Sequence, residues 1–262
     1  MTRIDKVMAD RQAAGKKAIF IYITAGAPDV RTTIEAVKRA EAAGADVIEL
    51  GLPFSDPMAD GPVIQTASVV ALKNGMTLAK ELDLVREIRK FSDIPLIGMG
   101  YINNMYHYGF EKFVEDFKAA GMDGVIIPDV PHEESGDLRR IAAAHDFVLA
   151  EFITPGTTAV RMEEICQNAS GFIYCVSNNG VTGVKKVDYS TIGAVCDTAR
   201  NYTRTPLAVG FGIGSPESAV AAAAHADAVI VGSAVVKELL AGKLDEAAQL
   251  IADIREALDK SY

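Results

Sequence analysis

Short runs of apolar and β-branched residues recur along the chain, and stretches with helical periodicity separate them. Eight such runs predict strands, over residues 18–24, 46–50, 95–99, 124–127, 147–152, 171–176, 206–209 and 228–231. Amphipathic stretches such as IEAVKRAEAAGAD and FVEDFKAAGMD precede nearly every run and predict helices that end near a glycine. Because the runs are apolar throughout, they are typical of strands buried on both faces, and the alternation predicts an all-parallel sheet.

Eight strand–helix units in a chain of 262 residues fit a closed (β/α)8 barrel better than an open doubly wound sheet. The first strand is followed by TAGAPD, which lacks the G-x-G-x-x-G fingerprint of many open sheets. The longest interval between strands predicts an insertion after the second strand, with helices over 63–73 and 77–90. Further helices are predicted over 4–14 and 244–258. With no linker or low-complexity tract, the α/β chain is expected to form a single TIM-barrel domain, 1–262.

Composition and charge narrow the possible partners. Apolar residues make up 49% of the chain and charged residues 23%, which predicts a folded domain with a substantial core. With 26 Lys and Arg against 35 Asp and Glu, the net charge is -9, so we expect neither nucleic acid nor a membrane as a partner. There is no signal-peptide pattern and no long apolar span, and Cys166, Cys175 and Cys196 form no C-x-x-C pair. These features predict a cytoplasmic protein.

In such a barrel the active site lies at the carboxyl ends of the strands, so residues that end a strand or follow it are the candidates for chemistry. Glu49 ends the second predicted strand and shares a strand face with Val47. An apolar setting favours the neutral carboxyl group and raises its pKa, which suits general acid–base catalysis near neutral pH. We interpret Glu49 as catalytic, and a salt-bridged glutamate at a strand end is the alternative.

The loop that follows Glu49, LPFSDPMADGP, contains three prolines and two aspartates. Asp56 and Asp60 compete for a catalytic role there, and each has the alternative of a turn residue that bonds its own backbone. Asp129 in IPDVP and Asn103 in YINN also follow strands, and a structural role is as plausible for each as a chemical one.

Two glycine-containing turns predict a phosphate site. GFGIGSPES follows the seventh predicted strand and VGSAVV follows the eighth, and each turn opens a helix. Backbone N–H groups at a helix N-terminus bind a dianion without Lys or Arg, and (β/α)8 barrels commonly bind phosphate at these two loops. Simple turn glycines are the alternative. A third glycine segment, SNNGVTGVKK, is interpreted as a lid, with Lys185 and Lys186 at a solvated edge.

Other chemistries are disfavoured by the residues. No predicted strand contains a lysine for a Schiff base, and the four histidines are scattered, which disfavours a metal site. Only His132 follows a strand closely, and we expect it to lie on the surface. The remaining prediction is acid–base chemistry by carboxyl groups, with no metal and no cofactor, on a small phosphorylated substrate.

Six segments, in their order and spacing, closely resemble the family of tryptophan synthase α subunits. They are ELGLPFSDPMADGPVIQ, IPDVPHEE, ITPGTT, SGFIYCVSNNGVTG, VGFGIGSPE and ADAVIVGSAVV. The resemblance covers nearly the whole chain. It implies a TIM barrel that cleaves indole-3-glycerol phosphate to indole and glyceraldehyde 3-phosphate in tryptophan biosynthesis. It also implies that indole passes to a pyridoxal-phosphate β subunit in an α2β2 complex.

The resemblance also implies roles for individual residues. Glu49 looks like the catalytic acid and base, and Asp60 looks like the carboxylate that holds the indole N–H. The residues similar to the family's substrate-binding positions are Tyr174, Phe211, Gly183, Gly212, Gly232 and Ser233. In the family, the rim that carries Phe54 and Asp56 faces the β subunit, which predicts partner contacts for these two residues.

The sequence departs from the family at Asn104, where many members have proline, and at Asn178, where some carry a basic residue. These differences concern the β-subunit contact and the lid. Two other functions stay open, a stand-alone lyase that releases indole and a barrel that binds a phosphorylated metabolite without catalysis. The presence of both Glu49 and Asp60 disfavours the second.

Overall fold

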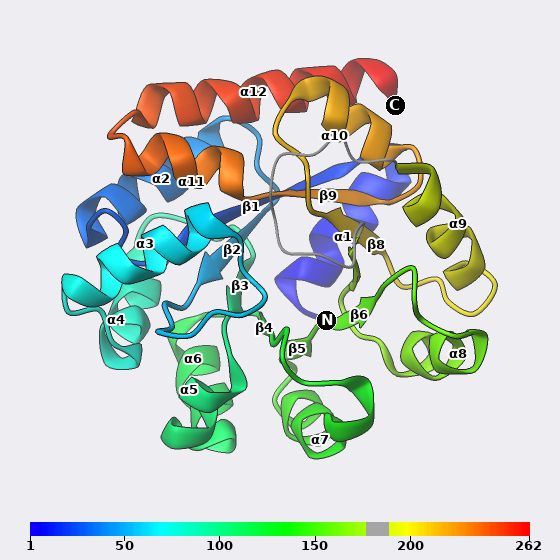
Figure 1. Cartoon of the computed structure of the whole chain (residues 1–262), viewed down its shortest axis with the longest axis horizontal. Coiled ribbons are helices and arrows are strands. Elements are labelled where there is room, and N and C mark those ends of the chain that lie inside the picture. Colours follow the sequence, from blue (N-terminus) through cyan, green and yellow to red (C-terminus); the bar gives the residue numbers. More distant parts are fainter. Residues whose placement is uncertain (177–188) are drawn as a thin grey trace.

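The computed structural model describes residues 1–176 and 189–262, and in them parallel strands form a barrel surrounded by helices (Figure 1). The strands are β1 (Ala18–Thr24), β2 (Val47–Gly51), β3 (Leu96–Met99), β4 (Gly124–Ile126), β5 (Val148–Leu149), β6 (Glu151–Ile153), β7 (Ile173–Val176), β8 (Leu207–Gly210) and β9 (Ala228–Val231). Their hydrogen-bonded order is β5-β4-β3-β2-β1-β9-β8-β7-β6. The predicted TIM barrel is confirmed.

The fifth predicted strand, 147–152, is wrong as a single strand, because Ala150 separates it into β5 and β6. The part before Ala150, β5, pairs with β4, and the part after it, β6, pairs with β7. One short segment therefore closes the barrel by pairing with a different neighbour on each side of Ala150. Apolar periodicity cannot reveal such a change of partner, because it reports burial and not pairing.

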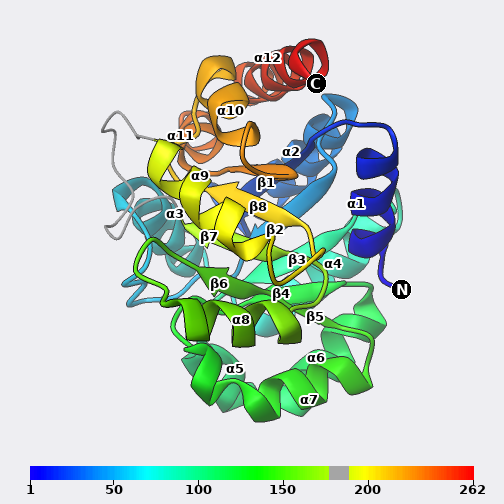
Figure 2. The same ribbon diagram turned by 90° about the vertical axis from the view of Figure 1, so that its right-hand side faces the viewer.

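Helices cover the outside of the barrel (Figures 1 and 2). They are α1 (Arg3–Ala13), α2 (Val30–Ala42), α3 (Pro62–Lys73), α4 (Leu78–Arg89), α5 (Ile102–Tyr108), α6 (Phe110–Ala120), α7 (Gly136–Ala144), α8 (Ala159–Asn168), α9 (Tyr189–Ala199), α10 (Pro216–Ala223), α11 (Ser233–Leu240) and α12 (Leu244–Ser261), with a 3-10 turn at His132–Glu134. The predicted N-terminal helix, the insertion after the second strand and the last helix are confirmed. Helix α5 was not predicted, because it buries only Met105 and therefore has little apolar periodicity.

The sequence of α6 explains its position. Phe110, Phe113, Val114 and Phe117 recur at helical spacing and are buried on one face, with the rings of Phe113 and Phe117 stacked at 4.3 Å. The helix ends at Gly121, whose φ of 108° lies in the left-handed region that favours glycine. The glycine that the sequence pattern marks is therefore the residue that stops the helix.

The core has two layers. Alternate residues of each strand point into the barrel or toward the helices, so Phe20 lies in the inner cluster and Ile19 and Ile21 lie in the outer one. Inside, the ring of Phe20 meets that of Phe172 edge-on, with centroids 4.9 Å apart. Helix α1 adds Ile4 and Met8 to the inner cluster, and it covers the end of the barrel opposite the carboxyl ends of the strands (Figure 2). That end is packed, which leaves the other end for a site.

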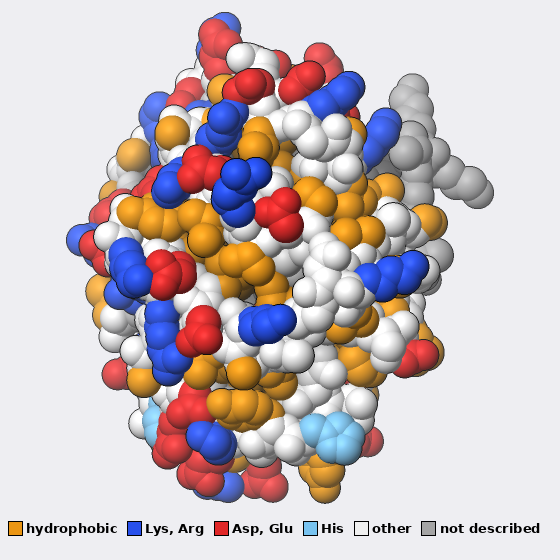
Figure 3. Space-filling model, turned by 90° about the vertical axis from the view of Figure 1, so that its left-hand side faces the viewer, with side chains coloured by type: hydrophobic (Ala, Val, Ile, Leu, Met, Phe, Trp, Pro, Cys, Tyr) orange, Lys and Arg blue, Asp and Glu red, His pale blue; other side chains and the backbone are white. Residues whose placement is uncertain are grey.

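The outer face over α2, α4 and α12 mixes positive and negative side chains among apolar ones (Figure 3). Several charges on these helices are paired, as in Lys38 with Glu35 at 2.7 Å and Arg86 with Asp83 at 2.9 Å. None of the helices in residues 1–176 and 189–262 is long and apolar enough to cross a membrane.

Three aspartates repeat one structural device at the closed end of the barrel. Asp46, Asp123 and Asp227 each stand directly before a strand, and each side chain accepts a backbone N–H of a neighbouring strand at 2.7 to 2.9 Å. Arginines from nearby helices pair with them, namely Arg11 and Arg255, Arg3 and Arg89, and Arg200. The short sequences GAD, GMD and HAD that precede these strands thus fasten the strands to the helices.

Replacing Asp123 with alanine is expected to destabilise the fold by about 3 kcal/mol or more, because Arg89 and the Leu96 N–H would lose a buried partner. Thermal unfolding should then occur roughly 10 °C lower. Asp93→Ala is the matched control, because Asp93 contacts Arg3 only at 3.9 Å and its side chain is 95% exposed. Equal losses in both variants would contradict a structural role for the buried aspartate.

Glu81 is a buried acid outside the cavity described below. It lies in the first turn of α4, is 2% exposed, and its Oε2 has no hydrogen-bond partner in the described part of the chain. Burial raises its pKa from 4.5 to about 8, so the folded protein keeps this proton at pH values where the unfolded chain has lost it. Glu81 therefore costs stability increasingly as the pH rises from 4.5 to 8.

We expect Glu81→Gln to raise the unfolding free energy at pH 7.5 by about 3 kcal/mol and to change it little at pH 5. Denaturant titrations at the two pH values measure this difference. Glu87→Gln on the same helix is the control, since Glu87 is half exposed and pairs with Lys90. A gain that is the same at both pH values would show that burial of the charge is not its cause.

Candidate active site

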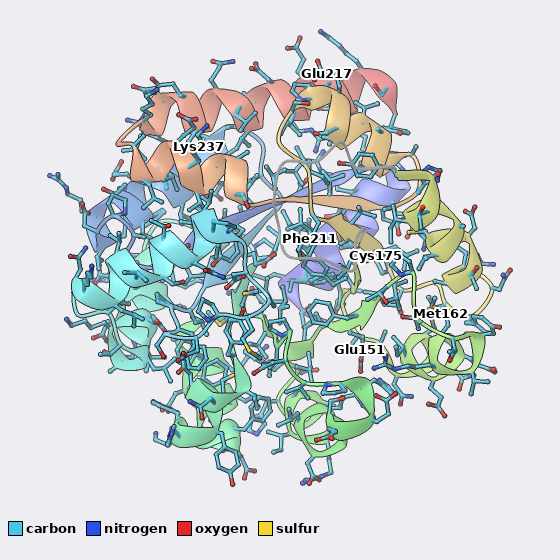
Figure 4. The ribbon with its side chains drawn as sticks, viewed as in Figure 1. Glu151, Met162, Cys175, Phe211, Glu217 and Lys237 are labelled. Atoms are coloured by element: carbon cyan, nitrogen blue, oxygen red, sulfur yellow. The ribbon has the colours of Figure 1, made fainter. Side chains whose placement is uncertain are left out.

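A cavity of about 1590 Å³ opens at the carboxyl ends of the strands, and most of the predicted site residues line it. These are Glu49, Asp60, Tyr174, Phe211, Gly212, Gly232 and Ser233. Gly183, Asn178, Lys185 and Lys186 lie outside the described residues. Phe211, which also lines the cavity, lies near the barrel axis. Glu217 of α10 and Lys237 of α11 line the cavity farther from the axis (Figure 4).

Glu49 points into the barrel from β2, in register with Tyr22 of β1 and Ile97 of β3. It is 2% exposed, and its Oε2 has no hydrogen-bond partner within the described ranges. Burial raises its pKa to about 8, and the nearby charge of Asp60 adds to this shift. At neutral pH, Glu49 therefore holds a proton that it can donate, as a general acid requires.

Asp60 ends the loop after β2 and lies in the same cavity. The structure buries Asp60 to 5% exposure. Burial raises its pKa to about 6, and the neighbouring Tyr101 hydroxyl opposes the rise. Asp60 is therefore still ionised at pH 7, whereas Glu49 is not, so the two carboxyl groups differ in protonation state at neutral pH.

Two tyrosine side chains flank Glu49. Each lies so close to a glycine at a strand end that a larger residue in the glycine's place would collide with its hydroxyl group. A Cβ atom on Gly51 would lie 2.0 Å from the Tyr22 hydroxyl, and one on Gly210 would lie 2.2 Å from the Tyr174 hydroxyl. Burial raises the pKa of both tyrosines well above 10, so both keep their protons. Tyr174 was predicted and Tyr22 was not, although alternation in AIFIYIT puts Tyr22 on the same strand face as Phe20, and Tyr22 lines the cavity.

Aromatic rings form one wall of the cavity. Tyr174 lies 5.2 Å from Phe152 and meets Phe211 edge-on at 6.5 Å, measured between ring centroids. Phe211 has a φ of 82°, a rare backbone conformation for a bulky residue, and Gly212 follows with 75°. Strained residues of this kind gather at functional sites. The wall offers apolar, planar contacts to a flat ring, and Phe152 is a member that sequence analysis missed.

The two glycine turns differ in how their helices begin. The Ser215 side chain accepts the Ser218 N–H and so caps α10. Helix α11 begins after Gly232, and no side chain in residues 1–176 and 189–262 caps its first N–H groups. Because Gly232 and Ser233 line the cavity, these donors lie where an anion can reach them.

Two other candidates, His132 and Asp129, have structural partners. His132 is buried rather than on the surface, with its Nδ1 atom 3.0 Å from Glu151 Oε1, because Glu151 and Arg139 provide polar partners for it. Asp129 Oδ1 accepts the Ile102 N–H at 3.0 Å. In the described part of the chain, no three His, Cys, Asp or Glu residues gather as a metal site, and Cys166, Cys175 and Cys196 are free thiols.

The predicted partner contacts lie on the loop after β2. Phe54 is partly exposed and stacks on Tyr101, with ring centroids 5.2 Å apart. Asp56 is exposed and accepts the Ser55 hydroxyl at 2.6 Å. Neither residue lines the cavity that contains Glu49 and Asp60.

Comparisons with known proteins identify the relatives of the chain. The family described as "Tryptophan synthase alpha chain" matches residues 8–261. The protein of that name from Caldanaerobacter subterraneus subsp. tengcongensis is 42% identical over 263 residues, covering 98% of this chain and 100% of the relative. A solved chain from Aquifex aeolicus VF5 superimposes with a TM-score of 0.92 at 36% identity, covering 98% of this chain and 99% of its own. Tryptophan synthase subunit alpha from Legionella pneumophila str. Paris gives 0.91 at 37% identity, covering 99% of both chains.

Proposed function

Because this chain belongs to the tryptophan synthase alpha chain family, we propose that Glu49 and Asp60 are the catalytic pair with which it performs the reaction of that family. The reaction is the cleavage of indole-3-glycerol phosphate to indole and glyceraldehyde 3-phosphate in tryptophan biosynthesis, and the chain is a lyase. The proposal depends on one observation, the two buried carboxyl groups of one cavity whose pKa values are raised to about 8 and about 6.

The proton transfers follow from these protonation states. Neutral Glu49 donates its proton to the indole carbon that bears the side chain, and positive charge develops on the ring nitrogen. Ionised Asp60 accepts the ring N–H and stabilises that charge. Glu49, now a carboxylate, removes the proton from the adjacent side-chain hydroxyl, and the carbon–carbon bond breaks as the aldehyde forms. Glu49 ends the cycle protonated, so no other acid or base is needed.

The remaining groups hold the substrate. The aromatic wall of Phe152, Tyr174 and Phe211 suits the flat indole ring. Within the wall, the three rings meet one another in the tilted and edge-on arrangements that aromatic pairs prefer. We assign the phosphate to the uncapped N-terminus of α11 at Gly232 and Ser233, together with the turn at Gly212. Gly183, which the family resemblance adds to this set, stays a prediction.

Gly232→Val is expected to weaken glycerol phosphate binding by about 100-fold or more, because the side chain would fill the space in front of the α11 N–H groups. The fold should tolerate the change, since a Cβ atom at Gly232 meets Tyr22 Cβ at an ordinary 3.5 Å. Calorimetric titration with glycerol phosphate measures the loss. Gly136→Val is the control, because a Cβ atom there has open space around it. Unchanged affinity in Gly232→Val would remove the phosphate from this helix end.

The family also has a β subunit as its partner, and we propose that this chain joins one in an α2β2 complex in the cytoplasm through the rim that carries Phe54 and Asp56. The exposure of Asp56 outside the cavity supports a contact role rather than a chemical one. A lyase assay of the purified chain, with and without a β subunit, tests the function. Indole release that rises strongly on adding the β subunit supports it. Full activity of the chain alone would favour a stand-alone lyase, and no cleavage in either assay would refute the proposal.

A further inference from the structure

The loop that carries Asp60 is fastened to the segment after β3 by three contacts. The ring of Tyr101 stacks on Phe54 with an interplanar angle of 25°. The Tyr101 hydroxyl accepts the Ala59 N–H at 2.9 Å, and Asn104 Nδ2 donates to the Pro53 carbonyl at 3.3 Å. Tyr101 makes two of the three contacts, one near each end of the loop, and it bonds the residue directly before Asp60.

Tyr101 is itself held firmly. It is 3% exposed, and the next residue, Ile102, donates its N–H to Asp129 Oδ1 at 3.0 Å. On its other side, Gly100 packs so closely that a Cβ atom there would lie 3.0 Å from Leu52 Cβ. A buried ring fixed on both sides along the chain is a rigid support for the loop that it touches.

The hydroxyl of Tyr101 has one proton left to donate. The Tyr101 oxygen accepts the Ala59 N–H. This leaves the Tyr101 O–H to donate to the carboxylate of the adjacent Asp60. Burial and Asp60 raise the pKa of Tyr101, so the tyrosine stays a donor over the working pH range. The other groups that act on this environment are Glu49 from β2, Tyr22 from β1, Tyr174 from β7 and Asp129 after β4.

We infer that Tyr101 is a positioning residue, whose ring and hydroxyl hold the loop of residues 53–61 and keep the Asp60 carboxylate ionised and aimed into the cavity. The inference rests on the proposed role of Asp60. Tyr101 acts through Asp60 and not on the substrate, so its loss should affect turnover more than substrate binding. The sequence pattern did not predict this interaction, because it joins two loops that α3, α4 and β3 separate along the chain.

The test is Tyr101→Phe, which keeps the stacking on Phe54 and removes only the hydroxyl. Without this donor the ionised form of Asp60 is less favoured, so the acid limb of the kcat/KM profile should move to higher pH by about half to one unit. We expect kcat to fall about tenfold and KM to change less than about twofold. Tyr108→Phe is the matched control, since the Tyr108 hydroxyl bonds Asp116 at 2.5 Å on the same segment, and it should change neither quantity.

Carboxyl ¹³C NMR of the isolated chain gives a readout independent of catalysis. Asp60→Asn identifies the Asp60 signal, whose titration midpoint should rise in Tyr101→Phe and stay unchanged in Tyr108→Phe. If the wild-type chain showed no lyase activity, the proposed function would fail while this titration still tested Tyr101. An unchanged Asp60 midpoint in Tyr101→Phe, even with a lower melting temperature, would overturn the inference and leave Tyr101 a packing residue.

Discussion

Glu49→Gln is expected to lower lyase turnover by about 10³- to 10⁴-fold while leaving the fold and substrate affinity nearly unchanged. The amide has the size of the acid, but it can neither donate a proton to the indole carbon nor accept one from the hydroxyl. Glu49 Oε2 has no partner in the described part of the chain, so the substitution breaks no hydrogen bond at that atom. Steady-state kinetics with the β subunit present measures the loss.

The pH dependence of the wild-type enzyme tests the same assignment. Activity should rise as Asp60 ionises near pH 6 and fall as Glu49 loses its proton near pH 8, which gives a bell-shaped kcat/KM profile. The two limbs belong to the coupled pair, because the charge of Asp60 raises the pKa of Glu49. Turnover of Glu49→Gln within about tenfold of wild type would exclude Glu49 from the mechanism.

Asp60→Asn should be the second severe loss, with turnover reduced by about 10²- to 10³-fold. Asparagine can still accept the ring N–H, but it carries no charge to stabilise the developing cation. Removing that charge also lowers the pKa of Glu49, so the alkaline limb of any residual activity should move to lower pH. Pre-steady-state cleavage assays across the pH range measure both effects.

The control for this prediction lies in the same loop. Asp56→Asn should leave the isolated chain within about threefold of wild type, because Asp56 is exposed and does not line the cavity. It is expected to weaken activation by the β subunit instead. A larger loss in the isolated chain from Asp56→Asn than from Asp60→Asn would reverse the assignment of the two aspartates.

Local pattern was sufficient to predict most of the architecture. Apolar runs such as AIFIYIT identify strands buried on both faces, and the spacing of phenylalanines in α6 identifies one buried helix face. Both patterns involve only residues that lie a few positions apart in the sequence. Because the apolar runs also mark where the strands end, the sequence alone places Glu49 at the mouth of the barrel. The raised pKa of Glu49 was also predictable, because an apolar strand buried on both sides leaves a carboxyl group little water.

Other features depend on contacts between residues far apart in the sequence, and only the tertiary structure decided them. The division of the fifth strand follows from its pairing with β4 on one side and β7 on the other. The burial of Asp60 depends on Tyr101, and the burial of His132 depends on Glu151, since each polar group needs a partner to leave water. A sequence pattern reports how often a residue type recurs, whereas burial and hydrogen bonding depend on which distant residue folds against it. The sequence alone therefore determined the barrel and the position of Glu49, and the tertiary structure determined the environment of Asp60.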